Sequence, residues 1–537
     1  MKTTFSKSIL ILAIAGISFT LSSCFGDLNR SPYYGLNTET VYSDPANYIN
    51  VLAKLYAGLA ITGNQGPAGQ ADISGIDEGF SGYVRVLWNL QELPTDEAVC
   101  AWADPGIPEL HQMDWNSENS FVTAMYYRIY YQIPLCNEFI RQSKLSEMQN
   151  RGFSQADIDR ITIYQTEARF LRALSYYHAL DLFGNVPFID ENDLPGSSFP
   201  TQISRADLFN YVESELLAVE NDLIDAKQNE YGRADKAAAW MVLAKLYLNA
   251  EVYNGVAHYT EAVTYSKKVI DAGYTLQPKY TDLFLTDNNL SNEIIFPVTS
   301  DGLNTQTYGG TTFLVHAPVG GKMKPADFGI NGGWAGYRTT AAFTAKFGVQ
   351  DSVSAYGDTL DSRNLFFIEG QKNQIAAIKT FADGYAIAKW KNLSSAGVKG
   401  SDAQGNFVDT DFPMFRLADA YLMYAEAVKR GGGGDEGTAT GYINALRERA
   451  YVNSSANITS SDLTLDLILD ERARELYWEG TRRTDLIRYG RFTTNSYLWP
   501  WKGGVAEGTS VADFRNIYPI PNADIVANTN LTQNFGY

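Results

Sequence analysis

Apolar residues recur every three or four positions along most of the chain, the spacing that places them on one face of an α-helix. In residues 44–60, for example, Tyr48, Leu52, Leu55 and Leu59 form one such stripe. The pattern predicts helices over residues 44–60, 120–144, 157–183, 205–226, 234–250, 258–272, 415–429 and 439–450. The chain is therefore predicted to be mostly α-helical.

Several of the predicted helices follow one another across short turns, as in helix–turn–helix units. Residues 234–247 interleave alanines with large residues such as Trp240, and small residues suit close packing between helices. The segments 415–429 and 439–450 repeat the pattern on either side of the glycine run 431–434. These irregular units resemble tetratricopeptide repeats. We expect a fold of tetratricopeptide-like helix pairs, with Trp240 in its core.

A different texture begins near residue 289. Gly, Asn and Thr dominate residues 289–400, with short β-like runs such as 293–298, and the tail 498–537 is similarly irregular. Long loops are uncommon in globular proteins and often carry function, so a loop-rich ligand-binding region is expected here. The mature chain is accordingly divided into a helical region, 24–288, and a second region, 289–537, packed together as one compact unit.

The N-terminus carries the features of a secretory signal. Lys2 and Lys7 flank the start of an apolar segment, residues 8–20, that is shorter than the roughly 20 residues of a membrane span. The quartet L-S-S-C that ends at Cys24 resembles a bacterial lipobox. Residues 1–23 are thus predicted to be a lipoprotein signal peptide, with Cys24 lipidated. The alternative is an ordinary secreted protein cleaved nearby.

The composition excludes several kinds of partner. With a net charge of −18, the chain has no cluster of Lys and Arg of the kind that nucleic acids and anionic lipid headgroups require. Besides Cys24, only Cys100 and Cys136 remain, and two buried free thiols are favoured over one disulfide. Aromatic residues are unusually frequent, at 34 Tyr, 27 Phe and 9 Trp, and they need a structural or functional explanation.

Motifs of common active sites are missing. The sequence contains no G-x-S-x-G, H-E-x-x-H or G-x-x-x-x-G-K-[ST] motif, and the glycines at 431–434 lack the lysine of a phosphate loop. No pair of carboxylates stands out as a glycosidase pair. The histidines are scattered at His111, His178, His258 and His316. The chain is therefore predicted not to be an enzyme and to need no cofactor.

Three aspartates are nevertheless candidates for a metal site. Asp409 and Asp411 can supply two oxygens to a calcium ion, with Asp287 from a distant loop as a third ligand. The alternative is that the pair caps the helix predicted over 415–429.

Charge is concentrated in residues 461–491. We expect Ser461 to cap a helix in which Glu479 meets the next arginines at spacings of three and four. The charged residues that follow are Arg482, Arg483, Asp485 and Arg488. They can form an anion site, but an ion-pair network that locks the C-terminal helix is favoured.

Several motifs together resemble the SusD/RagB family. They are C-F-G-D-L-N-R-S-P at 24–32, E-A-R-F-L-R-A-L-S-Y-Y at 167–177, D-L-F-G-N-V-P at 181–187, R-A-R-E-L-Y-W-E-G-T-R-R-T-D-L-I-R-Y-G-R-F at 472–492, Y-P-I-P at 518–521 and L-T-Q-N-F-G-Y at 531–537. The resemblance covers essentially the whole mature chain. It implies a mostly α-helical outer-membrane lipoprotein of Bacteroidota that binds glycans and passes oligosaccharides to a TonB-dependent transporter.

Other segments are similar to the starch-binding founding member of that family. They are D-E-G-F-S-G-Y-V-R at 77–85, N-L-Q-E-L-P-T-D-E at 89–97, T-Y-G-G-T-T-F-L-V at 307–315 and F-T-T-N-S-Y-L-W-P-W-K-G-G at 492–504. In that member an arc of aromatic side chains follows the curve of an α-glucan helix. The resemblance places the glycan-binding residues here at Arg85, Trp102, Asp104, Tyr308 and Trp334. The loop with Asp104 is one residue shorter here, and Cys100 replaces a second tryptophan.

These residue types suit a sugar. A pyranose has an apolar C–H face that aromatic rings can cover and an edge of hydroxyls that polar side chains can bond. Trp102, Tyr308 and Trp334 lie in Gly-, Pro- or Asn-rich segments and not on helical stripes. The expected function is capture of starch or maltooligosaccharide and delivery to a SusC-like transporter in the outer membrane. The alternatives are another polysaccharide such as a β-glucan, a lipid-anchored glycoside hydrolase, and a structural subunit of the transporter.

Overall fold

The computed structural model of the chain describes residues 37–67, 69, 71–196, 198–349 and 356–537. The predicted signal peptide and the lipidated Cys24 lie outside the described residues. The chain divides into two units, Met1–Tyr48 and Ile49–Tyr537. The first contains α2 (Thr38–Tyr42), whose cap residue Asn37 accepts a hydrogen bond from the Thr40 N–H at 2.8 Å.

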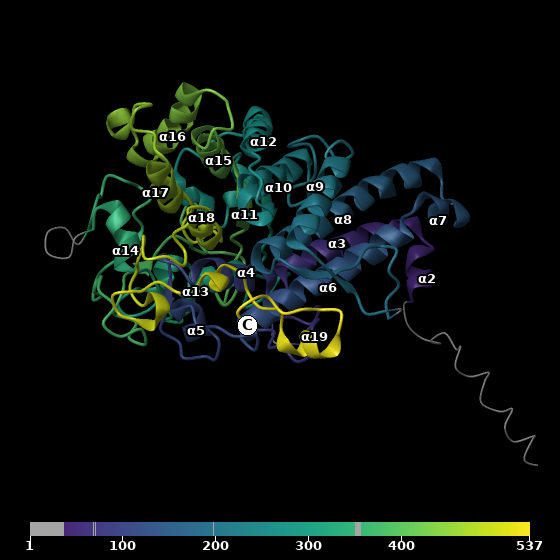
Figure 1. Cartoon of the computed structure of the whole chain (residues 1–537), viewed down its shortest axis with the longest axis horizontal. Coiled ribbons are helices and arrows are strands. Elements are labelled where there is room, and N and C mark those ends of the chain that lie inside the picture. Colours follow the sequence, from purple (N-terminus) through teal and green to yellow (C-terminus); the bar gives the residue numbers. More distant parts are fainter. Residues whose placement is uncertain (1–36, 68, 70, 197, 350–355) are drawn as a thin grey trace, which may run out of the picture. The chain divides into compact units, whose positions relative to one another are not determined.

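Helices dominate the second unit (Figure 1), and the mostly α-helical class predicted from the sequence is confirmed. Each predicted helix is present, with shifts at its ends. In chain order the helices are α3 (Tyr48–Ala60), α4 (Tyr83–Glu92), α5 (Ile107–Gln112), α6 (Ser120–Gln142), α7 (Leu145–Asn150), α8 (Gln155–Leu182), α9 (Arg205–Val219), α10 (Lys236–Leu248), α11 (Ala250–Asn254), α12 (Tyr259–Asp271), α13 (Gly310–His316), α14 (Ala341–Thr344), α15 (Leu417–Lys429), α16 (Glu436–Tyr451), α17 (Leu465–Leu476), α18 (Arg482–Arg488) and α19 (Asn522–Ala527).

Helix α4 is absent from the helices predicted from the sequence. Its polar residues Arg85, Asn89 and Glu92 recur at helical spacing, but they are buried like the rest of its ten residues, so its polar face meets protein and not solvent. It follows directly after the Gly- and Pro-rich residues 62–82, and it carries Arg85 in its first turn.

Helices that follow one another in the chain pack side by side. Helix α6 lies against α8 and α8 against α9, while α10 lies against α12 and α15 against α16 (Figure 1). Side-chain caps define where they begin: Ser154 accepts a hydrogen bond from the Asp157 N–H before α8, and Ser204 accepts one from the Asp207 N–H before α9. The glycines at 431–434 form the turn between α15 and α16, as predicted.

The loop-rich region connects α12 to α15, and these two helices contact each other. It opens with β4 (Ile294–Val298) and closes with β8 (Phe412–Arg416), which pair antiparallel and place Ile294 opposite Arg416. The β-like run predicted over 293–298 is thus confirmed. The division of the mature chain at residue 288 stays a prediction. Among the described residues the other strand pairs are β1 (Val99–Cys100) with β5 (Tyr337–Arg338), β2 (Val186–Phe188) with β3 (Thr201–Ile203), and β6 (Phe366–Phe367) with β7 (Ala386–Ile387).

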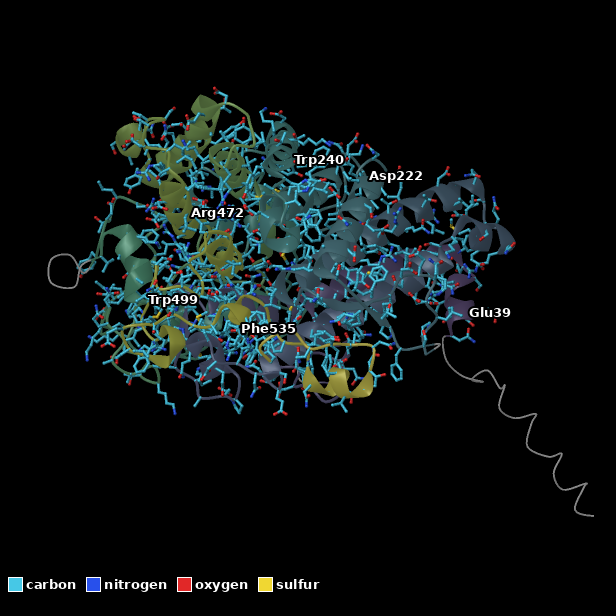
Figure 2. The ribbon with its side chains drawn as sticks, viewed as in Figure 1. Glu39, Asp222, Trp240, Arg472, Trp499 and Phe535 are labelled. Carbon is cyan, nitrogen blue, oxygen red and sulfur yellow. The ribbon has the colours of Figure 1, made fainter. Side chains whose placement is uncertain are left out.

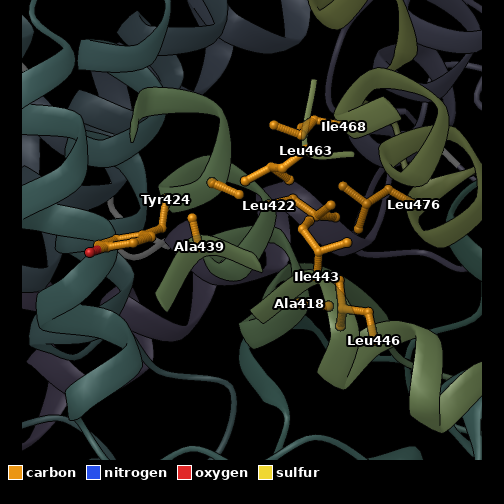
Figure 3. Packing of buried hydrophobic residues seen from close by; sticks show 10 residues of the cluster. Ala418, Leu422, Tyr424, Ala439, Ile443, Leu446, Leu463, Ile468 and Leu476 are labelled. Carbon is orange, nitrogen blue, oxygen red and sulfur yellow. The ribbon is translucent and has the colours of Figure 1, made fainter. Parts of the chain in front are cut away.

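A hydrophobic cluster joins α15, α16 and α17 (Figure 3). It includes Leu422 from α15, Ile443 and Leu446 from α16, and Ile468 and Leu476 from α17, each at most 3% exposed. Full burial of such a side chain is worth roughly 1.5–3 kcal/mol relative to exposure. The cluster therefore holds these three helices together.

The charged C-terminal segment differs from its prediction. Thr464, and not Ser461, caps α17. The helix ends before Trp478, whose φ of +62° is left-handed. Glu479 and the following arginines therefore do not share one helix, and the helical spacing between them is lost. The predicted helical ion pairs of Glu479 are therefore wrong.

The arginines of that segment pair instead with residues far away in the sequence or on neighbouring helices. The pairs are Arg482 with Asp96 at 2.8 Å, Arg483 with Asp181 at 3.6 Å and Arg488 with Glu426 at 2.7 Å. All six side chains are buried. They form the locking network that the sequence favours over an anion site.

Arg416, the last residue of β8, is the centre of a second buried network. Its guanidinium donates to Glu293 at 2.8 Å and to Glu475 and Glu479 at 2.6 Å each. Arg449 from α16 brings a further positive charge to Glu475. Burial alone would raise the pKa of Glu475, but the charges of Arg449 and Arg416 hold it well below its usual range. The network ties the base of the loop-rich region to α16 and α17.

Aromatic side chains fill much of the helical body. Tyr176 and Tyr247 are at most 3% exposed, as expected for residues at helical spacing. Trp240, marked in Figure 2, is only partly buried, and its indole N–H donates to Glu220 at 2.8 Å. Its predicted place in the core is therefore corrected to the edge of the helical body.

Replacing Glu475 with glutamine should lower the free energy of unfolding by about 3–5 kcal/mol, since it leaves buried guanidinium charges without their partner. The matched control is Asp466→Asn, which removes an exposed pair with Arg491 and should cost less than about 1 kcal/mol. Denaturant unfolding followed by circular dichroism measures both. Equal losses in the two variants would show that the network around Arg416 contributes no special stability.

Glu92 should make stability depend on pH. Its carboxylate accepts hydrogen bonds from the Gly480 N–H at 2.6 Å and the Thr481 N–H at 3.0 Å, and it faces Glu97. Burial raises the pKa of Glu92 to about 7. The folded chain therefore keeps a proton that the unfolded chain loses above about pH 4.3, and this contribution to the free energy of unfolding falls as the pH rises to about 7.

In Glu92→Gln this pH-dependent loss should disappear. The stability difference between variant and wild type should shift in favour of the variant from about pH 4.5 to 7 and then level off. Unfolding midpoints across that range measure it, with the exposed Glu507→Gln as control. A constant difference at every pH would refute the assignment.

Candidate functional site

Two helices begin side by side where glycines allow a close approach. Helix α4 follows Gly82 and α13 follows Gly309, and a Cβ added at Gly82 would lie 3.2 Å from the Cα of Gly309. This approach places Arg85 of α4 next to Tyr308, which precedes α13. Arg85 Nη1 donates to the carbonyl of Tyr308 at 3.1 Å and to that of Gly79 at 2.8 Å.

Arg85 is a buried charge among aromatic rings. Its Cζ lies 4.6 Å from the centre of the Phe313 ring and 6.0 Å from those of Trp102 and Trp334. The residue is 8% exposed, and its buried Nε has no hydrogen-bond partner among the described residues. Burial lowers the pKa of Arg85, and the charge of Asp104 opposes this shift. The guanidinium therefore places a buried positive charge next to the rings.

A short sheet brings Trp102 and Trp334 together. Strand β1 pairs with β5, and just beyond it the Ala101 N–H donates to the carbonyl of Gly336 at 2.8 Å. Trp102 packs against Gly336 so closely that a Cβ there would lie 2.3 Å from the indole Cε2. The Trp102 indole N–H donates to the carbonyl of Trp334 at 2.9 Å. This bond fixes the ring and leaves its faces, not its N–H, for a ligand.

Trp102, Trp334 and Tyr308 form a row of partly exposed rings, here called the aromatic arc. The ring centres of Trp102 and Trp334 are 6.2 Å apart, with planes at 46°. Those of Trp334 and Tyr308 are 6.4 Å apart, with planes at 61°. Successive planes thus differ strongly in direction, and the arc presents an angled surface beside Arg85.

A pocket of about 600 Å³ adjoins the arc. Arg85, Trp102 and the exposed Asp104 line it together with Asp77 and Phe80. The structure therefore brings the five residues predicted from the sequence into one region. Asp77 and Phe80 were missed, although they lie in the same family-like segment, 77–85, as Arg85.

The three carboxylates of the calcium hypothesis accept hydrogen bonds from nearby loops. Asp409 accepts one from the Gly302 N–H at 2.7 Å, and Asp287 accepts one from the Ser395 N–H at 2.9 Å. Over the described part of the chain, no group of three or more His, Cys, Asp or Glu side chains can hold a metal ion. A calcium site at Asp409 and Asp411 stays a prediction without support here. The capping alternative is wrong, because β8 separates the pair from α15.

The thiols and the histidines described here are buried and packed against other protein groups. Cys100 and Cys136 are buried free thiols, as the sequence favours. His178 bonds the hydroxyl of Tyr83 at 2.8 Å inside the helical body. His316 was also missed as a site residue, since nothing in its local sequence shows that its ring stacks on the arc.

Comparison with known proteins gives matches over the whole chain. A family model described as the SusD family matches residues 275–537. The chain is 39% identical to the starch-binding protein SusD of Bacteroides thetaiotaomicron, and the alignment covers 100% of both chains. It is 28% identical to a SusD-like protein of Bacteroides ovatus over 62% of this chain and 60% of that one.

Solved structures share the fold. Surface glycan-binding protein A from Bacteroides thetaiotaomicron, in complex with laminarihexaose, matches with a TM-score of 0.65 and 20% identity over 91% of this chain and 99% of that one. A SusD superfamily protein from Parabacteroides distasonis matches with a TM-score of 0.69 and 20% identity over 94% and 100%. At this identity the likeness shows the fold alone.

The variant Gly336→Ala should displace the Trp102 ring, because its new methyl group would overlap the indole. We expect a changed tryptophan signal in near-ultraviolet circular dichroism and a loss of about 1–3 kcal/mol in the free energy of unfolding. Gly332→Ala, in the same loop, is the control, since no atom lies within 4 Å of a Cβ there. An unmoved Trp102 in a crystal structure of Gly336→Ala would contradict the packing described here.

Proposed function

Because the chain belongs to the SusD family, we propose that it is a non-catalytic receptor that binds an α-glucan of the starch class on the aromatic arc. The full-length relative is named for binding starch and not for a reaction, which agrees with the prediction that the chain is not an enzyme. The arrangement of the three rings is the observation that carries the proposal.

The angled arc suits a coiled ligand. Chains of α-1,4-linked glucose curve, so successive sugar rings turn relative to one another, whereas extended polysaccharides present flatter ribbons. The angles of 46° and 61° between successive ring planes of the arc suit the turning sugar rings of a curved α-glucan. Each ring can cover the C–H face of one sugar, worth roughly 0.5–1.5 kcal/mol by analogy with aromatic pairs.

Polar groups at the edge of the arc supply hydrogen bonds to hydroxyls. The guanidinium of Arg85 lines the pocket and can donate, and the exposed carboxylate of Asp104 can accept. The two side chains line the same pocket as Trp102, so an adjoining sugar can meet a ring, a donor and an acceptor together. The net charge of −18 suits a neutral polysaccharide and opposes a polyanion.

A β-glucan is the second candidate ligand. The solved relative with laminarihexaose shows that the same fold carries a glucan of another linkage. The arc can stack on its sugars by the same C–H contacts, so the linkage has to be decided by measured affinity.

We further propose that the receptor is anchored at the outer membrane through Cys24 and passes its ligand to a SusC-like TonB-dependent transporter. The lipobox-like quartet ending at Cys24 and the family membership support this part. Within the described residues, no helix is both long enough and apolar enough to cross a membrane.

Trp102→Ala and Trp334→Ala should each weaken maltoheptaose binding at least tenfold, about 1.4 kcal/mol, because each removes one stacking surface. Isothermal titration calorimetry measures the affinity, and circular dichroism confirms folding. Phe535→Ala is the control: this aromatic residue is 91% exposed, is marked in Figure 2 and lies outside the arc, so its loss should leave the affinity unchanged.

Unchanged affinity in both tryptophan variants would exclude the arc as the binding site. Tighter binding of laminarihexaose than of maltoheptaose to the wild type would select the second ligand. Release of reducing sugar from either oligosaccharide would overturn the non-catalytic role in favour of a glycoside hydrolase.

A further inference from the structure

His316 lies directly against the aromatic arc. It is the last residue of α13 and is 2% exposed. Its imidazole stacks on the indole of Trp334, with ring centres 5.0 Å apart and planes at 22°. One face of this indole is therefore covered by the protein itself, and a ligand can use only the opposite face.

Two hydrogen bonds tie His316 to the loop that carries Trp334. Its backbone carbonyl accepts from the Trp334 N–H at 2.9 Å, and its Nδ1 lies 2.7 Å from the carbonyl oxygen of Gly332. A carbonyl oxygen only accepts, so Nδ1 carries the proton. Burial lowers the pKa of His316, which keeps the ring neutral at neutral pH. The stack sets the tilt of the indole, and the in-plane bond sets the rotation of the imidazole.

The loop needs such support. Ala335, directly after Trp334, has a left-handed φ of +48°, which a residue with a side chain rarely adopts. Backbone of this kind persists where surrounding contacts hold it. The Ala335 N–H donates to the carbonyl of Val319 at 2.9 Å. Together with the bonds of His316, this makes residues 316–319 a clamp on the loop.

The same helix also fixes the other end of the arc. Helix α13 begins two residues after Tyr308 and ends at His316. Tyr308 is held at its start by the bond from Arg85, and Trp334 is held at its end by His316. The 6.4 Å spacing of Tyr308 and Trp334 therefore depends on α13 at both ends.

We propose that His316 is a positioning residue for glycan binding, which sets the tilt of Trp334 without touching the ligand. This inference rests on the proposed function of the arc. An aromatic ring with an in-plane N–H donor meets both requirements. Phenylalanine keeps the stack but loses the bond to Gly332, and glutamine keeps a donor but loses the stack.

Calorimetry with maltoheptaose on His316 variants tests the proposal. His316→Ala should weaken binding about three- to tenfold, the size of one aromatic pair. His316→Phe and His316→Gln should each weaken binding by less than His316→Ala, because each variant keeps one of the two features. In a Trp334→Ala background, His316→Ala should cause no further loss, because its action passes through Trp334.

The control is His178→Ala, which removes another buried histidine, one that contacts Tyr83 and Tyr177 and none of the three rings of the arc. It should lower thermal stability and leave the affinity of the folded protein unchanged. Wild-type affinity in His316→Ala, or a further loss in the double variant with Trp334→Ala, would overturn the positioning role.

A crystal structure of His316→Ala separates this inference from the proposed function. A changed tilt of Trp334 supports positioning, and an unchanged tilt overturns it, whether or not maltoheptaose binds. Failure of the wild type to bind maltoheptaose would instead count against the proposed α-glucan ligand.

Discussion

Buried charges can stabilise a fold only when their partners are present, and Arg416 meets this requirement at the junction of the molecule. From the last position of β8 it donates to Glu293, Glu475 and Glu479, which come from the start of the loop-rich region and from the C-terminal segment. Arg449 adds a second cation from α16. Segments that are far apart in sequence are thus joined at Arg416. Removal of any one of its carboxylate partners leaves a buried charge uncompensated.

The candidate site depends on this junction. Strands β4 and β8 close the base of the loop-rich region where α12 meets α15, so the loops between them extend from a fixed frame. Within that frame, α13 and α4 begin close together at Gly309 and Gly82, and Arg85 joins the two helices through the Tyr308 carbonyl. The arc is therefore held by side-chain hydrogen bonds to backbone carbonyls, by the stack of His316 and by close glycine contacts, which give its rings defined directions before any ligand arrives.

The sequence predicted those parts whose signature is local. Amphipathic stripes marked helices such as α6 and α8, and the glycines at 431–434 marked a turn. Helix α4 was missed although Arg85, Asn89 and Glu92 recur at helical spacing, and only the tertiary structure shows that this polar face is buried. The pairing of Glu479 failed for a different reason: the spacing was helical, but the left-handed turn at Trp478 ended the helix first. The family resemblance supplied the site residues, and the residues that support them, such as His316, carry no local mark.

By itself the sequence determined the helical class, the family and the fact that Trp102, Tyr308 and Trp334 lie outside helical stripes. Only the tertiary structure decided that these rings stand 6.2 and 6.4 Å apart at steep angles, with Arg85 beside Trp102 and Trp334. The reason is physical: they come from segments separated by long stretches of chain. Their approach depends on the β1–β5 pair and the contact between α4 and α13, long-range contacts that leave no periodic pattern in the residues that make them.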